Sequence, residues 1–138
     1  MTLPTRPLGP FTVSSVGLGC MNLSHAYAAP PPPEYSQRLL NRALDLGVTM
    51  LDTAALYGGG NNERLIASAV RHRRDEFTLA SKCVLGMRDG KRVLDGSPEA
   101  IAASIDGSFR IATPRATATS GFTYATTVAR AGPTSGAT

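Results

Sequence analysis

Three side chains of complementary chemistry stand where short apolar runs of the sequence end. Asp52 closes the run over residues 48–53, Tyr57 comes five residues later, and Lys82 follows the run over residues 77–80. A tyrosine hydroxyl is a poor proton donor at neutral pH, but a nearby ammonium favours the phenolate and makes the hydroxyl a better acid. A carboxylate beside the lysine would keep that ammonium charged and fixed. The three groups together could deliver a proton to a developing alkoxide, the general-acid half of a carbonyl reduction.

A purely structural interpretation of the same residues stays open on the residue types alone. Asp52 could cap a junction between strand and loop, Tyr57 could pack its ring, and Lys82 could be solvated. The sequence around the three residues is what decides between the two interpretations.

The segments that must position them alternate between short apolar runs and helical patterns, which is typical of βα units with a parallel sheet. We predict strands within residues 13–21, 48–53 and 77–80, each followed by a helix. Gly47 is placed to end the first helix, Asn61 or Asn62 to cap the second, and Ser97 to cap the third. Residues 86–96 are predicted to be a loop. In parallel α/β folds, ligands bind at the carboxyl ends of the strands, where the three chemical groups fall.

The regular pattern stops near residue 110. In residues 111–138, eight Thr and seven Ala make up 15 of the 28 positions, with no apolar stripe or strand alternation of useful length. Such a segment buries too little apolar surface to offset its ordering entropy. We therefore predict an ordered part over residues 1–109 and a disordered Ala/Thr-rich tail over residues 110–138.

Composition excludes several other classes of protein. The 138 residues suffice for one domain or part of one, and 42 % of them are hydrophobic. The net charge of +4 reflects scarce acids, since residues 111–138 contain two Arg and no acid, so no nucleic-acid partner is expected. Two cysteines are too few for a disulfide framework or a metal site. With no apolar stretch for export or membrane spanning, we expect a cytoplasmic protein without a membrane partner.

The amino-acid sequence around Asp52, Tyr57 and Lys82 resembles that of the aldo-keto reductases. The matching segments are Gly47–Ala54 (GVTMLDTA), Tyr57-Gly58, Asn62-Glu63 and Ala80-Ser81-Lys82, and Val16–Asn22 (VGLGCMN) resembles the first barrel strand of bacterial members. The resemblance covers about Leu8 to Phe109. It implies a (β/α)8 TIM barrel, an α/β fold, that transfers hydride from NADPH to a small-molecule aldehyde or ketone.

The resemblance also implies a role for each residue. Tyr57 would donate the proton, Lys82 would make its hydroxyl more acidic, and Asp52 would pair with Lys82 near the nicotinamide ribose. Gly19, Cys20 and Met21 match the segment after the first strand that lies near cofactor and substrate. The family's catalytic tetrad includes a histidine after the fourth strand, and neither His25 nor His72 stands there.

Length is the main departure from the family. A complete barrel has eight βα units and typically about 250 residues, whereas we count three units here. We expect these three units, preceded by a short N-terminal hairpin, and we expect the family's main contacts to the NADP phosphate and adenine to be missing. Two functions are compatible with this: an NADP-dependent oxidoreductase, or a catalytically inactive barrel fragment from a truncated or frameshifted gene. The oligomeric state stays open.

Overall fold

The computed structural model describes residues 3–24 and 29–112 and, for the backbone alone, residues 122–124. His25 and most of the predicted tail lie outside these ranges. No helix within them is long and apolar enough to cross a membrane.

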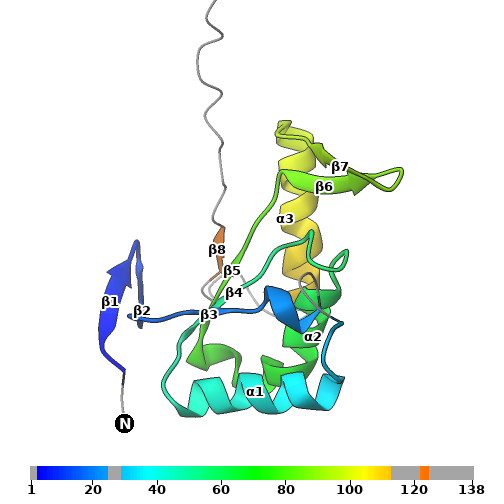
Figure 1. Cartoon of the computed structure of the whole chain (residues 1–138). Coiled ribbons are helices and arrows are strands. Elements are labelled where there is room, and N and C mark those ends of the chain that lie inside the picture. Colours follow the sequence, from blue (N-terminus) through cyan, green and yellow to red (C-terminus); the bar gives the residue numbers. More distant parts are fainter. Residues whose placement is uncertain (1–2, 25–28, 113–121, 125–138) are drawn as a thin grey trace, which may run out of the picture.

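A four-stranded parallel sheet forms the centre of the molecule (Figure 1). Its strands are β3 (Leu18–Gly19), β4 (Met50–Asp52), β5 (Thr78–Ser81) and β8 (Phe122–Tyr124), in that spatial order. The register aligns Leu51 of β4 with Leu18 on one side and with Leu79 on the other. The three predicted strands are therefore present: β3 and β4 are shorter than predicted, and β5 has the predicted length but begins one residue later. Because the strands are parallel and in register, their carboxyl ends meet at one edge.

The fourth strand differs from the sequence prediction. We predicted no strand beyond residue 110, yet Phe122–Tyr124 pairs in parallel with β5, with Ser81 opposite Tyr124. Strand pairing satisfies backbone N–H and C=O groups whatever the side chains are, so it leaves little trace in a hydrophobicity pattern. The division of the chain near residue 109 otherwise stays a prediction.

Three helices follow one another beside the sheet: α1 (Pro33–Asp45), α2 (Asn61–Val70) and α3 (Pro98–Ala112) (Figure 1). Helix α2 packs against both of the others. Short 3-10 turns, η1 (Met21–Leu23) and η2 (Arg71–Glu76), follow β3 and α2. The core lies between the sheet and the helices α1 and α2. Its buried members are Cys20, Leu23, Leu40, Leu44, Leu51, Ile66, Ala69, Val70, Phe77 and Leu79.

The helix ends partly match their predicted caps. Gly47, in the left-handed region at φ 88°, follows the last turn of α1, and the Ser97 hydroxyl accepts a hydrogen bond from Ala100 N–H at the start of α3. The prediction for α2 was wrong: its N-cap is Gly60, at φ 84°, and no side chain caps it. The residue that begins this helix has positive φ, which glycine adopts without strain. This conformation favours Gly60 over Asn61 or Asn62 as the N-cap.

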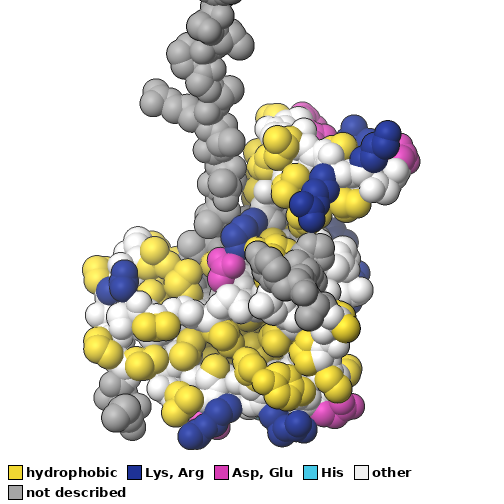
Figure 2. Space-filling view, in the orientation of Figure 1, with side chains coloured by type: hydrophobic (Ala, Val, Ile, Leu, Met, Phe, Trp, Pro, Cys, Tyr) yellow, Lys and Arg dark blue, Asp and Glu magenta, His cyan; other side chains and the backbone are white. Residues whose placement is uncertain are grey.

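Two antiparallel hairpins extend from this body. Strands β1 (Thr5–Leu8) and β2 (Phe11–Ser14) form the predicted N-terminal hairpin. Strands β6 (Leu85–Arg88) and β7 (Lys91–Leu94) form a second hairpin where a loop was predicted. Figure 2 shows hydrophobic and basic side chains together on this projecting hairpin. The described part of the chain is thus an open α/β assembly of successive strand and helix units, and it does not close into a barrel.

Candidate active site

Asp52 and Lys82 meet at the carboxyl edge of the sheet. Asp52 is the last residue of β4, and Lys82 follows the last residue of β5, the neighbouring strand. The Lys82 ammonium donates to Asp52 Oδ1 at 2.5 Å and to the Thr53 carbonyl at 3.0 Å. Both side chains remain partly exposed to solvent. The structure therefore forms the predicted pair and gives the ammonium two acceptors.

Tyr57 completes the group from the turn that follows β4. Its backbone N–H donates to the Ala54 carbonyl at 3.0 Å, which fixes the turn. Lys82 Nζ lies 5.4 Å from the centroid of the Tyr57 ring, within the range of a cation–π contact. One ammonium thus faces both the carboxylate and the phenol ring. The structure therefore brings the ammonium to the Tyr57 ring, an arrangement that the acid chemistry expected from the residue types would require.

A cavity of about 260 Å³ lies directly against these groups. Its wall is apolar except at Tyr57 and Lys82, and its lining residues are Ala54, Leu56, Tyr57, Lys82, Cys83, Val84, Leu85 and Leu94. Ligand pockets usually combine an apolar lining with a few placed polar groups, and this cavity is slightly below their usual volume of about 300–1,000 Å³. The arrangement suits a small molecule with one polar atom directed at Tyr57.

The hairpin β6–β7 lines part of the cavity, with residues that the sequence interpretation missed. Leu85 and Leu94, which pair with each other across the hairpin, both line it. The available signal was Asp89-Gly90, a typical two-residue hairpin turn, and both residues have positive φ, at 50° and 73°. A second cavity, of about 380 Å³, lies between this hairpin, α3 and the turn after β4.

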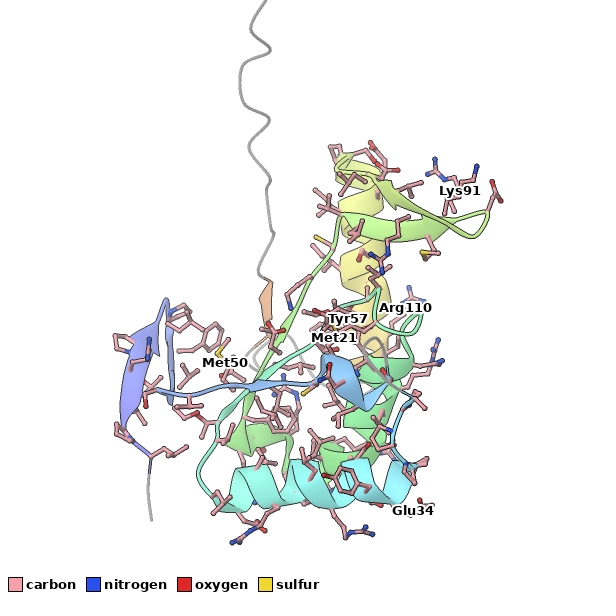
Figure 3. All side chains as sticks on the ribbon, in the orientation of Figure 1. Met21, Glu34, Met50, Tyr57, Lys91 and Arg110 are labelled. Atoms are coloured by element: carbon pink, nitrogen blue, oxygen red, sulfur yellow. The ribbon has the colours of Figure 1, made fainter. Side chains whose placement is uncertain are left out.

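The predicted cofactor segment also lies at this edge. Gly19 pairs with Asp52 in the sheet, and the Cys20 N–H donates to the Asp52 carbonyl at 2.8 Å. Apart from its two chain neighbours, no described residue has an atom within 4 Å of the place where a Cβ on Gly19 would stand. Met21 begins η1, the 3-10 turn that follows Cys20 (Figure 3). Gly19 and the Cys20 backbone therefore lie against Asp52, and Met21 follows them in the chain.

The two cysteines have structural environments, as expected of small thiols that pack in a core. Cys20 is fully buried, and its thiol donates to the Leu18 carbonyl at 3.5 Å. Burial, with a further contribution from the Asp52 charge, raises the pKa of Cys20 to about 12. Cys83 is buried in the cavity wall. Among the described residues, no group of three or more His, Cys, Asp or Glu side chains could hold a metal.

These residues fit the nicotinamide end of an NADP cofactor better than its phosphates. Open space above Gly19, the Asp52 carboxylate and the apolar cavity are suited to an aromatic ring with its attached ribose. The cations that line the two cavities are Lys82 and Arg88, and each is paired with a carboxylate, Arg88 with Asp95 at 3.3 Å. Among the described residues, these cavities therefore offer no unpaired cation for a phosphate group.

The histidine that the resemblance implies has no counterpart at the fourth strand. Strand β8 ends at Tyr124, and the sequence contains no histidine after His72. His72 is exposed in η2, after helix α2. The site in this chain thus contains three of the four expected side chains.

Comparison with known proteins identifies the family. The model of the aldo/keto reductase family matches residues 15–112. "Aldo-keto reductase yakc [NADP(+)]" of Schizosaccharomyces pombe is 37 % identical over 114 residues, which cover 80 % of this chain and 33 % of that protein. The solved aldo-keto reductase AKR11C1 of Bacillus halodurans, in its holo form, is 31 % identical with a TM-score of 0.70, covering 80 % of this chain and 37 % of that one.

A solved aldo-keto reductase of Klebsiella pneumoniae in complex with NADPH is 25 % identical with a TM-score of 0.57, and it covers 82 % of this chain and 36 % of its own. The chain therefore spans between about a third and two fifths of the length of these relatives. The family model covers most of the sequence, and the sheet and helices superpose on reductases of known structure: this chain belongs to the aldo/keto reductase family.

Proposed function

We propose that this chain carries the proton-donating part of an NADP-dependent carbonyl reductase site, with Tyr57 as the donor. The observation that carries the proposal is the position of Lys82 Nζ, which contacts both Asp52 Oδ1 and the Tyr57 ring. A reduced nicotinamide, when bound, supplies the hydride. The remaining chemistry belongs to the side chains of this chain.

In this mechanism the carbonyl oxygen of the substrate lies next to the Tyr57 hydroxyl. As the carbonyl carbon accepts the hydride, its C=O π electrons move to oxygen, which takes the Tyr57 proton and gives an alcohol. Lys82 stabilises the phenolate through its positive charge, and solvent then returns a proton to Tyr57. Asp52 keeps the ammonium in place by accepting its hydrogen bond.

The cavity indicates the class of substrate. Its apolar wall beside Tyr57 and Lys82 favours a small aldehyde or ketone whose carbonyl is the only polar group at that end. Asp52 and the backbone of residues 19–21 would lie against the nicotinamide and its ribose. We also expect the protein to act in the cytoplasm, since Cys20 and Cys83 are both free and buried.

A second candidate function is a barrel portion without activity of its own. One observation favours it: the sequence after β8 contains no histidine where the resemblance implies one. In that case the family relationship describes descent, and the Asp52, Tyr57 and Lys82 cluster is retained without turnover.

NADPH titration of the purified chain, followed by its oxidation in the presence of aldehydes and ketones, separates the two. The reductase proposal predicts micromolar binding and carbonyl-dependent loss of NADPH absorbance, abolished by Tyr57→Phe. Tyr35→Phe is the matched control, because Tyr35 is half exposed on α1. Unchanged turnover in Tyr57→Phe would refute the proton-donor assignment, and a folded chain that binds no NADPH would establish the second candidate.

A further inference from the structure

The first turn of helix α2 buries two polar side chains that the proposed chemistry does not use. Asn62 is 0 % exposed and Glu63 is 1 % exposed. Side chains of this kind are mostly exposed in proteins, and burying them is unfavourable unless they are hydrogen-bonded. Their hydrogen-bond partners therefore indicate what the burial achieves.

Glu63 holds the end of β5 from the side opposite the ion pair. Ser81, the last residue of β5, donates from Oγ to Glu63 Oε1 at 2.7 Å. Successive residues of an extended chain point to opposite sides. Ser81 is thus held by the helix, while Lys82, the next residue, reaches Asp52.

Asn62 holds the end of β4 in the same way. Thr53 donates from Oγ1 to Asn62 Oδ1 at 2.7 Å, and Asn62 Nδ2 donates to the Cys20 carbonyl at 2.8 Å. Thr53 follows Asp52 directly, and its carbonyl is the second acceptor for the Lys82 ammonium. The backbone N–H of Asn62 also donates to the Tyr57 carbonyl at 3.2 Å. One turn of helix therefore contacts the neighbour of each charged residue and the backbone of Tyr57.

We propose that Asn62 and Glu63 are positioning residues that set where Lys82 Nζ stands relative to Asp52 and the Tyr57 ring. Their side chains act through Thr53 and Ser81, and neither residue lines the cavity itself. Displacements of about 1 Å in a catalytic group can cost a reaction about 100-fold in rate. This consequence for catalysis rests on the proposed function. The geometric claim about Lys82 is independent of turnover.

The test measures the Lys82 ammonium itself by 15N–1H NMR of the side chain, assigned with Lys82→Arg. An ammonium held by Asp52 Oδ1 and the Thr53 carbonyl should exchange its protons slowly enough to be observed. Thr53→Val keeps the side-chain shape but removes the donor to Asn62, and Ser81→Ala removes the donor to Glu63. We expect proton exchange at Lys82 at least about ten-fold faster in both variants, as loss of a fixed hydrogen-bond geometry requires.

Two further variants separate positioning from a general loss of structure. Thr53→Ser retains the hydroxyl and should restore the slow exchange. Ser68→Ala is the matched control on α2, because its exposed hydroxyl donates only to the Leu65 carbonyl, so the Lys82 signal should not change. If Thr53→Val does not fold, Ser81→Ala carries the comparison.

Folded Thr53→Val and Ser81→Ala proteins with the parent exchange rate at Lys82 would overturn the proposal. So would a parent protein in which Lys82 exchanges as fast as a solvated lysine. In an active chain, Thr53→Val should lower kcat while leaving KM near the parent value. An inactive parent would contradict the proposed function, and faster Lys82 exchange in Thr53→Val and Ser81→Ala would still support the positioning role.

Discussion

Replacing Asn62 with Ala should destabilise the fold far more than the same change one residue earlier. Asn62 is fully buried, and its amide joins β4, the segment after β3 and α2 through hydrogen bonds to Thr53, Cys20 and Ser24. Asn61 is exposed, and its side chain accepts one hydrogen bond, from Arg64 at 3.2 Å. The two substitutions change helix propensity in the same direction and by the same amount.

The magnitude follows from the groups that Asn62→Ala leaves buried. The Thr53 hydroxyl loses its partner, and an unsatisfied buried polar group costs about 1–3 kcal/mol. The Cys20 carbonyl keeps a hydrogen bond from Leu23 N–H at 3.0 Å, so it loses one of two bonds, at a net cost of about 0.5–1.5 kcal/mol. The expected loss is therefore about 1.5–4.5 kcal/mol of unfolding free energy, a large share of the roughly 5–15 kcal/mol of a typical domain. Asn61→Ala should stay within about 0.5 kcal/mol of the parent, as surface substitutions do.

Urea unfolding followed by far-UV circular dichroism measures both variants against the parent. The reasoning predicts a much lower midpoint for Asn62→Ala at an unchanged slope, with Asn61→Ala close to the parent. Equal midpoints for the two variants would refute it, because the buried amide would then contribute no more than an exposed one.

Three other predictions concern stability. Gly58→Ala should destabilise more than Gly59→Ala in the same assay: both glycines have φ near +60°, but a Cβ at Gly58 would lie 3.2 Å from the Ser24 carbonyl, and one at Gly59 would meet nothing within 4 Å. Burial raises the pKa of Cys20 from 9.0 to about 12, so the unfolded chain loses the thiol proton at a lower pH than the folded chain does. The buried thiol therefore contributes its full stability below pH 9 and loses that stability as the pH rises toward 12. Between pH 8 and 10 the parent should lose about 1.4 kcal/mol more than Cys20→Ala, and equal losses would contradict the assignment. Ser97→Ala should cost about 1 kcal/mol through loss of the N-cap of α3, and an unchanged urea midpoint would show that the cap contributes nothing.

Local signals explain why much of the site could be predicted from the sequence. The strand ends at Asp52 and Lys82 followed from short apolar runs, and their meeting followed from the parallel order of the strands. Ser97 was recognisable as a cap because it precedes a proline and an acid at a helix start. Each inference needed only a few neighbouring residues.

Features that depend on contacts across the fold were missed. Asn62 and Glu63 were recognised at the start of a helix, but their burial was not predicted, because periodicity does not reveal that Thr53 and Ser81 lie behind them. Val84 is another case: this β-branched residue has φ 79°, a strained conformation imposed between Cys83 and the hairpin. Hydroxyl partners and tertiary strain arise only once the strands and helices are assembled.

Transfer of a labelled hydride tests the central claim most directly. The purified chain is incubated with NADPH that carries deuterium at the transferred position and with a small aldehyde, and a Tyr57→Phe protein purified in the same way corrects for contaminating reductases. The account predicts deuterium on the carbinol carbon of the alcohol with the parent and none above background with Tyr57→Phe. Equal label in the two products, or none with a folded parent, would contradict the claim that Tyr57 and Lys82 form a working proton donor in this chain.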